Sequence, residues 1–424
     1  MAKIFLHTSG CSFNHADSET ITGILLRAHH QFVASEDEAE LVILNSCTVK
    51  SNPEQRLHAT MRRLSRERKK FIVAGCVPQA DSANKLFSHV PVLGVNALDK
   101  VDELVNLTLA ESEQAFNKEL FLSSTQQDML RFPSSRLHPF REIIPLNAGC
   151  LSSCSYCKTK DARGDLFSYD PRLIRNRFRQ AINDGAKEIW LTSQDTGAYG
   201  LDRETNIARL LSLLLEKEGS FRVRLGMTNP TYVHRFQDEL IKIFSHPSLF
   251  KFLHIPVQSG SNSVLRRMKR GYRVEQFVNI VKAFRKADPL ITIATDIICG
   301  FPGETEKDFD ETLKLIDKLE IPVVNISKFY LRPGTQAEHF EQHNSILIKK
   351  RSTALAALHK KIALRSQQPW KQWQGSVLVC EKGKNNTLIA RNDWYKQIIL
   401  QEGILGTFQE VKVKTVYPFD LRTF

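Results

Sequence analysis

The sequence predicts an α/β protein in three parts: an N-terminal domain on a parallel sheet, a partial (β/α)6 barrel, and a small C-terminal antiparallel β-barrel. Short apolar runs alternate with helical patterns over residues 1–110, and the alternation resumes in longer units over residues 141–366. This alternation is typical of βαβ units and hence of parallel sheets. Residues 369–424 instead carry short β-type runs separated by turn residues, a pattern that favours an antiparallel barrel.

In the N-terminal part, apolar runs predict a helix over residues 17–28 and strands at residues 3–6, 41–44, 71–74 and 92–95. Three of these strands are each followed by a cysteine, namely Cys11, Cys47 and Cys76. Because the C-terminal ends of parallel strands lie along one edge of a sheet, we expect the three thiols to converge there. Separate buried cysteines are the alternative, since cysteine is common in protein cores. The shared position after a strand favours a metal cluster.

Residues 111–140 lose this periodicity and carry clusters of Ser and Pro, so we expect a linker there. Beyond it, apolar runs predict strands at residues 143–146, 188–191, 222–225, 252–255, 291–298 and 323–326. Helical patterns lie between these runs. Six β/α units indicate an open barrel of parallel strands, with its site at the C-terminal ends of the strands.

A loop directly after the first barrel strand carries Cys150, Cys154 and Cys157 in the spacing C-x3-C-x2-C. Three thiolates on one short loop can hold three irons of a four-iron cluster and leave the fourth iron open to a ligand. An open position is typical of catalytic metal sites. A zinc knuckle is the alternative. Zinc sites commonly add a second C-x2-C or a histidine pair, however, and neither stands at a suitable distance here.

The chain has a formal net charge of +13, which favours a polyanionic partner such as RNA, although a solvated basic surface would carry the same charge. Basic residues are densest at 62–70, 172–179 and 266–273. The C-terminal residues 369–424 have a slight basic excess, which suits an RNA-binding barrel. A capping domain without a ligand is the alternative.

The N-terminus turns polar at His7, too early for a signal peptide, and no apolar run reaches the roughly 18 residues of a membrane span. We therefore expect a cytoplasmic protein that does not contact a membrane. In that compartment the eight cysteines are better explained as metal ligands than as disulfides. Cys299 and Cys380 stand outside both groups of three and are expected in the core.

Ordered motifs run along the chain at residues 9–19 (SGCSFNHADSE), 45–49 (NSCTV), 74–79 (AGCVPQ), 149–158 (GCLSSCSYCK), 193–200 (SQDTGAYG), 254–261 (HIPVQSGS), 295–305 (TDIICGFPGET) and 332–335 (RPGT). Together they resemble the methylthiotransferase family of radical S-adenosylmethionine (SAM) enzymes over nearly the whole chain. The resemblance implies a radical SAM barrel over residues 141–366. It also implies a TRAM domain, the small RNA-binding barrel of this family, over residues 369–424.

The resemblance implies two 4Fe-4S clusters. One binds SAM at its open iron, splits it to a 5′-deoxyadenosyl radical, and is held by Cys150, Cys154 and Cys157. The auxiliary cluster carries sulfur and is held by Cys11, Cys47 and Cys76. Other residues are expected to bind or orient cofactor or substrate: Tyr156 at the adenine, the turn of Gly300, Pro302 and Gly303, and the polar Ser193, Gln194, Asp195, Gln258 and Arg332. For the turn and the polar residues, purely structural roles are the alternative.

Branches of this family modify isopentenyladenosine in tRNA, N6-threonylcarbamoyladenosine in tRNA, or an aspartate of a ribosomal protein. Residues 157–164 (CKTKDARG) resemble the archaeal and eukaryotic threonylcarbamoyladenosine branch, and Phe424 is not preceded by the hydrophobic anchor of the eukaryotic members. The expected reaction is therefore methylthiolation of C2 of that adenosine, next to the anticodon. Expected partners are the tRNA anticodon loop, an electron donor of ferredoxin or flavodoxin type, and a sulfur donor. The other two substrates, and an iron–sulfur RNA-binding protein without turnover, stay open as alternatives.

Overall fold

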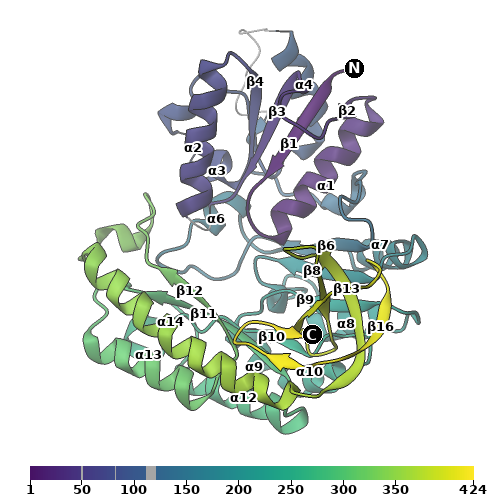
Figure 1. The fold of residues 1–424 in the computed structure, drawn as a ribbon. Helices are drawn as coiled ribbons and strands as arrows, with labels where there is room; N and C mark the ends of the chain where they lie inside the picture. The colour runs from purple at the N-terminus through teal and green to yellow at the C-terminus, as the bar shows by residue number, and fades with distance from the viewer. Residues whose placement is uncertain (49–50, 82, 111–120) are drawn as a thin grey trace.

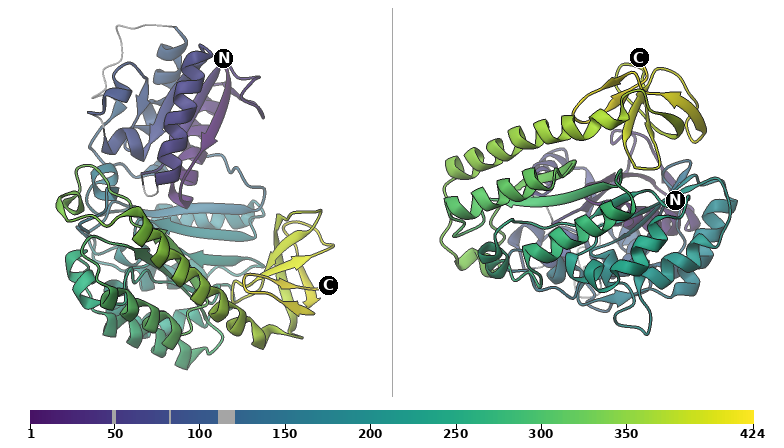
Figure 2. Two further views of the ribbon diagram at one scale, coloured as in Figure 1. Left: turned by 60° about the vertical axis from the view of Figure 1, so that its left-hand side comes forward. Right: turned by 90° about the horizontal axis from the view of Figure 1, so that it is seen from below.

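The computed structural model describes residues 1–48, 51–81, 83–110 and 121–424. An N-terminal α/β domain stands on a curved barrel of parallel strands, and a C-terminal sheet packs against the barrel (Figure 1, Figure 2). This is the predicted fold class. Val49 of one predicted motif and residues 111–120 of the predicted linker lie outside the described residues.

The N-terminal domain is a parallel sheet between two layers of helices (Figure 1). Its strands are β1 (Lys3–Thr8), β2 (Gln31–Phe32), β3 (Leu41–Ser46), β4 (Lys70–Gly75) and β5 (Val92–Leu93). They lie in the order β2-β1-β3-β4-β5. The helices are α1 (Ser12–Arg27), α2 (Ser51–Arg66), α3 (Cys76–Ala80) and α4 (Val101–Leu109).

Strand β3 is buried on both faces, which explains its continuous apolar sequence. Its side chains alternate between two hydrophobic cores, as the two-residue period of a strand requires. Leu41 and Ile43 join the core that also contains residues of α1 and α4. Val42 and Leu44 join the core formed with α2.

Helix α1 begins at Ser12, five residues before the helix predicted over residues 17–28. The prediction was wrong at this end because the first turns are buried without being apolar. Asn14, Asp17 and Ser18 are all buried, and their polar side chains meet polar partners at the sheet edge and at the barrel. An apolar pattern is therefore a poor guide to where α1 starts.

The barrel contains the strands β6 (Arg141–Ala148), β8 (Glu188–Ser193), β9 (Arg222–Leu225), β10 (Phe252–His254), β11 (Thr292–Cys299) and β12 (Val323–Lys328), each at a predicted position. β6, β8 and β9 pair in parallel, as do β10, β11 and β12. Main-chain hydrogen bonds join the two halves, among them those from Phe250 N to Val223 O (2.9 Å), from Val223 N to Ser248 O (2.7 Å) and from Thr228 N to His254 O (2.9 Å). The short β7 (Phe167–Ser168) pairs antiparallel with β6 and was not predicted.

Helices cover the outside of the barrel (Figure 2). They are α7 (Pro171–Asn183), α8 (Ile207–Leu215), α9 (Pro230–Arg235), α10 (Gln237–Phe244), α11 (Asn262–Arg267), α12 (Val274–Ala287), α13 (Glu306–Lys318) and α14 (Ser345–Gln367). The short α6 (Thr159–Arg163) follows the cysteine loop and contacts α3 of the N-terminal domain.

The C-terminal sheet has the order β16-β13-β14-β15-β18-β17. Its strands are β13 (Gln374–Lys382), β14 (Leu388–Arg391), β15 (Gln397–Leu400), β16 (Phe408–Lys412), β17 (Thr415–Val416) and β18 (Leu421–Arg422). The predicted run at residues 409–417 is divided between β16 and β17. β15 and β18 run parallel, so the sheet is antiparallel apart from this pair. Its strands surround a core of their own that includes Trp370, Val379 and Leu421.

This sheet is attached where the barrel strands begin, at the end of the barrel away from the cysteine loop. Arg141, the first residue of β6, binds Glu381 (2.8 Å), and Arg222, the first residue of β9, binds Asp393 (2.7 Å). Thr292, the first residue of β11, donates its hydroxyl to the Trp394 carbonyl (2.7 Å). Because these contacts are buried or partly buried, they fix the sheet to the barrel.

The described part of the predicted linker, residues 121–140, has little regular structure but is bound to both domains. Ser135 N donates to the Glu19 carbonyl (2.9 Å), and Leu137 N donates to the Glu19 carboxylate (3.2 Å). Gln126 Nε2 donates to the Arg163 carbonyl (2.6 Å). The segment therefore runs along the junction between the N-terminal domain and the barrel.

A buried ion pair connects these two domains. Both guanidinium nitrogens Nη1 and Nη2 of Arg163, at the end of α6, donate to the carboxylate of Asp17 in α1. Each side chain is 3% exposed. Burial opposes the charge of Arg163, but the Asp17 carboxylate outweighs it and raises the pKa of the guanidinium. A second contact joins the Ser12 and Thr192 hydroxyls (2.6 Å).

No helix in the described part of the chain is both long and apolar enough to span a membrane.

Asp17→Asn should lower the free energy of unfolding by about 3–5 kcal/mol, because it leaves the buried Arg163 charge without a counterion. Denaturant unfolding followed by circular dichroism measures this change. Asp317→Asn is the matched control, since Asp317 and its partner Arg365 are 54% and 52% exposed. That variant should unfold almost as the parent protein does. Equal effects of the two changes would contradict an energetic role for the buried pair.

The pH dependence of stability should depend on Glu19. Burial raises the pKa of Glu19 from about 4.5 to about 7. Its contribution to stability is therefore complete below pH ~4.5 and is lost as the pH rises through ~7, a loss of roughly 3 kcal/mol. Melting temperatures of Glu19→Gln between pH 5 and pH 8 should fall less than those of the parent protein. Parallel curves for the two proteins would argue against this prediction.

Candidate active site between two groups of cysteines

The loop of Cys150, Cys154 and Cys157 leaves the C-terminal end of β6 through a tight turn at Gly149. Gly149 has φ +71°, and a Cβ at this position would lie 1.9 Å from the Asp165 carbonyl oxygen, so only glycine fits. Cys150 N donates to the Gly164 carbonyl (3.3 Å). The turn thereby folds the loop back over the end of the strand and places the three thiols above the barrel opening.

Each thiol of this loop lies close to a hydrogen-bond donor. Ser152 N donates to Cys150 Sγ (3.4 Å), Thr159 N donates to Cys157 Sγ (3.3 Å), and Arg270 Nη1 donates to Cys154 Sγ (3.2 Å). Burial nevertheless raises the pKa of Cys150 to about 11 and raises that of Cys157. Thiols in this environment become thiolates when a metal cation replaces the proton.

Arg270 is a site residue that the sequence did not single out. Besides Cys154, it binds the Tyr272 hydroxyl through Nε (3.1 Å). Its Nη2 is buried, and within the described residues it has no hydrogen-bond partner. A guanidinium with an unused N–H group is suited to bind an anion such as a carboxylate. The sequence shows Arg270 only as one member of the basic run at residues 266–273, and burial alone separates it from exposed neighbours such as Arg266.

Tyr156 packs against the loop that follows β11. Its ring meets Phe301 edge to face, with ring centroids 6.1 Å apart. Ser155 N donates to the Met268 carbonyl (3.1 Å), and Ala337 N donates to the Ser155 carbonyl (2.8 Å). The cysteine loop is therefore held against three later segments of the barrel, which follow α11, β11 and β12.

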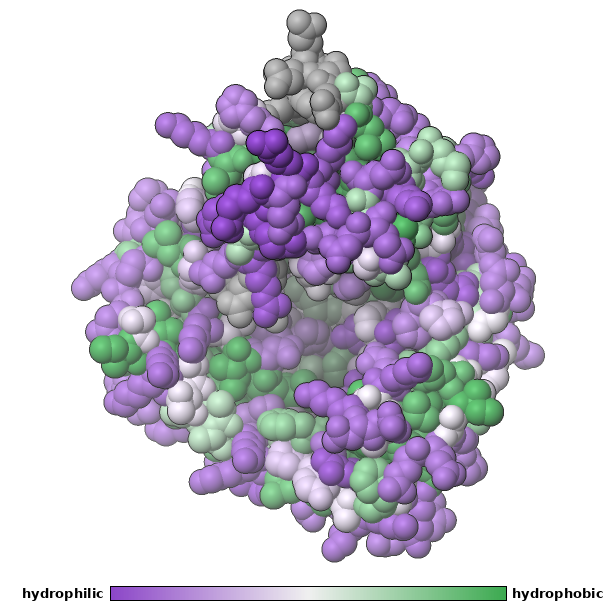
Figure 3. All heavy atoms as spheres, turned by 45° about the horizontal axis from the view of Figure 1, so that its top comes forward, coloured by the Kyte–Doolittle hydropathy of each residue, from purple (hydrophilic) through white to green (hydrophobic). Residues whose placement is uncertain are grey.

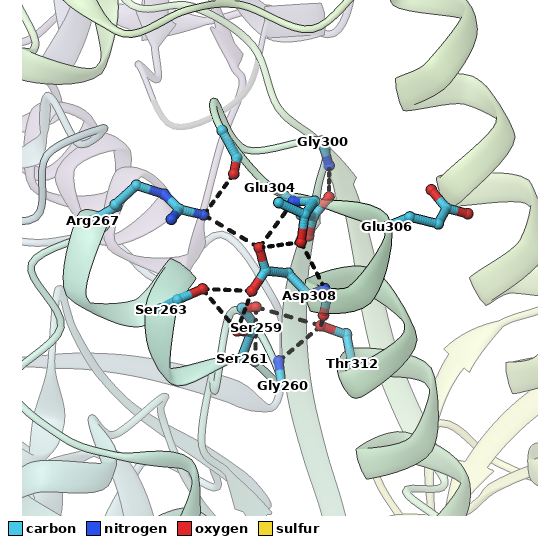
Figure 4. Close-up of polar contacts among 12 residues, drawn as sticks. Ser259, Gly260, Ser261, Ser263, Arg267, Gly300, Glu304, Glu306, Asp308 and Thr312 are labelled. Atoms are coloured by element: carbon cyan, nitrogen blue, oxygen red, sulfur yellow. Dashed lines mark hydrogen bonds and ion pairs between the residues drawn. The ribbon is translucent and has the colours of Figure 1, made fainter.

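The turn of Gly300, Pro302 and Gly303 is fixed by a polar network around Asp308 and Glu304 (Figure 4). Glu304 accepts a hydrogen bond from Gly300 N (2.8 Å). Asp308 accepts bonds from the hydroxyls of Ser261 and Ser263 (2.5 Å each), and so connects this turn to the segment after β10. Gly300 and Gly303 have φ +75° and +73°. The network holds the turn in one conformation beside Tyr156.

The polar residues predicted after β8 lie next to the cysteine loop. Asp195 is buried and accepts bonds from Asn229 N (3.0 Å) and Gly197 N (3.1 Å), while burial raises its pKa to about 6. Its charge adds to the burial that raises the pKa of Cys150. Ser193 accepts a bond from Asp195 N (2.9 Å). The Gln194 carbonyl oxygen Oε1 is buried, and within the described residues it has no partner.

Gln258 and Arg332 have structural contacts of their own. Gln258 adopts φ +70° and pairs with β11 through its main chain, accepting from Ile298 N (3.0 Å) and donating to Asp296 O (2.8 Å). Arg332 follows β12 and is buried, and it donates to Glu54 in the first turn of α2 (2.5 Å). Arg332 thus connects the barrel to the N-terminal domain at the opening.

Cys11, Cys47 and Cys76 lie together at the C-terminal edge of the N-terminal sheet. Cys11 precedes α1, Cys47 follows β3, and Cys76 is the first residue of α3. A hydrogen bond with Cys47, helped by the charge of Arg163, lowers the pKa of Cys11 to about 6 against the effect of burial. Burial raises the pKa of Cys76. The other two cysteines of the chain, Cys299 and Cys380, are buried in the barrel and in the C-terminal sheet.

The described residues contain no set of three His, Cys, Asp or Glu side chains that could hold a single metal ion. A four-iron cluster takes each thiolate on a different iron, so its cysteines are spaced more widely than the ligands of one ion. Each group of three thiols therefore suits three irons of a four-iron cluster better than it suits one metal ion.

The two groups of cysteines lie on the two sides of the domain junction, where α6 contacts α3. Arg163 comes six residues after Cys157, and its partner Asp17 comes six residues after Cys11. Arg163 also lies over the Phe13 ring (4.4 Å from its centroid); its charge helps to lower the pKa of Cys11 and opposes the burial that raises the pKa of Cys76. The surface is hollowed here, between the N-terminal domain and the barrel (Figure 3).

Residues 144–316 match the radical SAM superfamily, and residues 3–95 match a family described as "Uncharacterized protein family UPF0004". The solved structure of TsrM from Kitasatospora setae, described as a radical S-adenosylmethionine methyltransferase with cobalamin and a [4Fe-4S] cluster bound, has a similar fold. The TM-score is 0.57 at 13% identity, over 80% of this chain and 77% of that one.

Three relatives resemble the chain over nearly its whole length. It is 40% identical to the threonylcarbamoyladenosine tRNA methylthiotransferases of Danio rerio and Homo sapiens, over 97% of its own length and 76% and 72% of theirs. It is 39% identical to the probable threonylcarbamoyladenosine tRNA methylthiotransferase of Pyrococcus horikoshii, over 98% of its length and 97% of that protein. Together with the barrel and its cysteine loop, this similarity shows that the chain belongs to the threonylcarbamoyladenosine tRNA methylthiotransferase family of radical SAM enzymes.

Proposed function

We propose that this chain is a cytoplasmic enzyme that adds a methylthio group to C2 of N6-threonylcarbamoyladenosine next to the anticodon of tRNA. The product is 2-methylthio-N6-threonylcarbamoyladenosine. The observation that carries the proposal is the pair of cysteine groups at the domain junction in a chain about 40% identical to enzymes of this name. The tRNA substrate is also consistent with the net charge of +13.

The residues around the first cysteine group fit a 4Fe-4S cluster with SAM. Cys150, Cys154 and Cys157 supply thiolates for three irons, so one iron stays open. Next to them lie two buried groups without partners among the described residues, the donor Arg270 Nη2 and the acceptor Gln194 Oε1. SAM has a carboxylate that accepts hydrogen bonds and an ammonium that donates them. When bound, the cluster and SAM supply the electron and the 5′-deoxyadenosyl radical that removes hydrogen from the substrate.

The protein's own part in this chemistry is binding and orientation. Arg270 would hold the carboxylate end of SAM through its unpartnered Nη2, and Gln194 with the adjacent Asp195 would receive the ammonium end. Tyr156 and the rigid turn from Gly300 to Gly303 would form the wall at the adenine. The barrel strands beneath them shield this end of the site from water.

We assign an auxiliary 4Fe-4S cluster, which supplies the sulfur, to Cys11, Cys47 and Cys76. Three thiols at one sheet edge fit a cluster with one open iron, as in the barrel. Arg163 supports this assignment because its buried positive charge, balanced by Asp17, lies next to Cys11 and Cys76 and offsets negative charge on their thiolates. A ferredoxin- or flavodoxin-type donor of electrons and a separate sulfur donor complete the turnover.

The target adenosine has to leave the stack of the anticodon loop to reach the hollow between the clusters. Bases in single-stranded loops can be turned out at a cost of a few kcal/mol, as other base-modifying enzymes do. The hollow lies between the N-terminal domain and the barrel, so residues of both surround the base (Figure 3).

Anaerobically reconstituted protein, incubated with tRNA bearing N6-threonylcarbamoyladenosine, SAM, a reductant and sulfide, should form the 2-methylthio nucleoside. Mass spectrometry of the digested tRNA detects it. Cys154→Ala should abolish both the product and 5′-deoxyadenosine, because it removes an iron ligand. Cys299→Ala, a buried cysteine in neither group, should retain both.

Two outcomes would contradict the proposal in different ways. Product formation by Cys154→Ala would refute the radical mechanism. Formation of 5′-deoxyadenosine without product by the parent protein would keep the mechanism but refute the substrate, and isopentenyladenosine tRNA and the ribosomal-protein aspartate would be tried next.

Each cysteine group should account for about half of the bound iron if each holds four of the eight irons of two 4Fe-4S clusters. The triple variant Cys11→Ala, Cys47→Ala, Cys76→Ala should lose half the iron and keep reductive cleavage of SAM. The variant Cys150→Ala, Cys154→Ala, Cys157→Ala should also lose half but stop cleavage. Iron analysis and 5′-deoxyadenosine quantification measure the two effects. Full iron content in the first variant would exclude the auxiliary cluster.

A further inference from the structure

Helix α2 has one apolar face and one strongly basic face. Leu57, Met61 and Leu64 are buried against the sheet. Arg56, Arg62, Arg63 and Arg66 are exposed. At 100° per residue these four arginines lie within about one third of the helix circumference. We call them the α2 arginine strip.

Among the described residues, most of the charge of the strip is not balanced by an acidic partner. Arg63 binds Glu36 (2.6 Å) and Glu67 (3.0 Å). In the described part of the chain, Arg56, Arg62 and Arg66 make no ion pair. Three like charges on one helix face repel each other in the free protein. They therefore do not stabilise the helix. A solvated surface helix is more often built from charges of both signs.

The strip starts at the proposed active site and leads away from it. Glu54, in the first turn of α2, is held at the barrel by Arg332 (2.5 Å). The preceding segment of chain contains Cys47. From this point α2 runs up the N-terminal domain, and strongly hydrophilic side chains gather above the hollow on that side (Figure 1, Figure 3). From Arg56 to Arg66 the helix rises about 15 Å.

We propose that the α2 arginine strip binds the phosphate backbone of the tRNA anticodon stem while the target base occupies the hollow. This rests on the proposed function, which places the modified base between the two cysteine groups. The anticodon stem must then extend away from the hollow. Along α2 it would meet a row of guanidinium groups. Arginine matches phosphate through parallel N–H donors. A strip of about 15 Å is long enough to follow several successive phosphates of one RNA strand.

The test compares two variants that lose the same charge. The first is Arg56→Gln, Arg62→Gln, Arg66→Gln. The control is Arg172→Gln, Arg175→Gln, Arg179→Gln on α7, which covers the outside of the barrel. Affinity for unmodified and threonylcarbamoylated tRNA is measured by fluorescence anisotropy from 50 to 300 mM salt. Melting temperature, iron content and tRNA-free cleavage of SAM verify that each variant is intact.

The strip variant should bind tRNA at least about tenfold more weakly near physiological salt, and its slope of log K against log salt should fall by roughly 2–3. Arg62→Gln alone should lower the slope by about 1. The control should bind like the parent protein. Unchanged binding by the strip variant, or equal losses in both triple variants, would overturn the inference.

The same data separate this inference from the proposed function. If the parent protein binds tRNA through the strip but forms no methylthio product, the proposed function fails and the inference stands. If the parent protein forms product and the strip variant binds and reacts as well as the parent, the inference fails and the proposed function stands.

Discussion

The buried ion pair of Asp17 and Arg163 determines how the two cysteine groups lie relative to each other. Asp17 is on the helix that follows Cys11, and Arg163 ends the short helix that follows Cys157. Asp17 is therefore fixed close to the group of Cys11 and Arg163 close to the group of Cys157. A shift of either domain would separate two charges that are buried from solvent. That separation is costly in a medium of low dielectric. The same guanidinium stabilises negative charge at Cys11 and Cys76, so assembly of the domains and electrostatics of the site depend on one side chain.

Both groups of cysteines lie at the C-terminal ends of parallel strands. In both parallel sheets the chain turns at the C-terminal end of a strand, and the cysteines lie in those turns. The N-terminal domain is then set on the barrel so that the two edges oppose each other. Glycine at 149 permits the tight turn of one loop, and the Asp308 network stiffens the turn on the other side of it. Rigid turns on strand ends hold a cofactor more accurately than free loops would.

Much of the fold could be predicted from the sequence because the strands of the barrel and of the N-terminal sheet are short apolar runs. The features that could not be predicted depend on contacts between residues far apart in the sequence. The start of α1 is polar because Asp17 meets Arg163 146 residues later. Arg270 looks like its exposed neighbours until the barrel closes around Cys154. Arg332 was predicted at the cofactor, but its contact with Glu54 arises only when the domains pack. The parallel pairing of β15 with β18 is likewise a tertiary event.

The attachment of the C-terminal sheet to the beginnings of the barrel strands sets a distance scale for any RNA the protein binds. Strand β11 has eight residues, which span roughly 26 Å from the sheet's attachment to the end near the cysteines. A nucleic acid that touches both the C-terminal sheet and the hollow must extend over the height of the barrel. The length of the barrel strands would therefore favour a folded RNA that spans this distance over a short fragment that carries the same base.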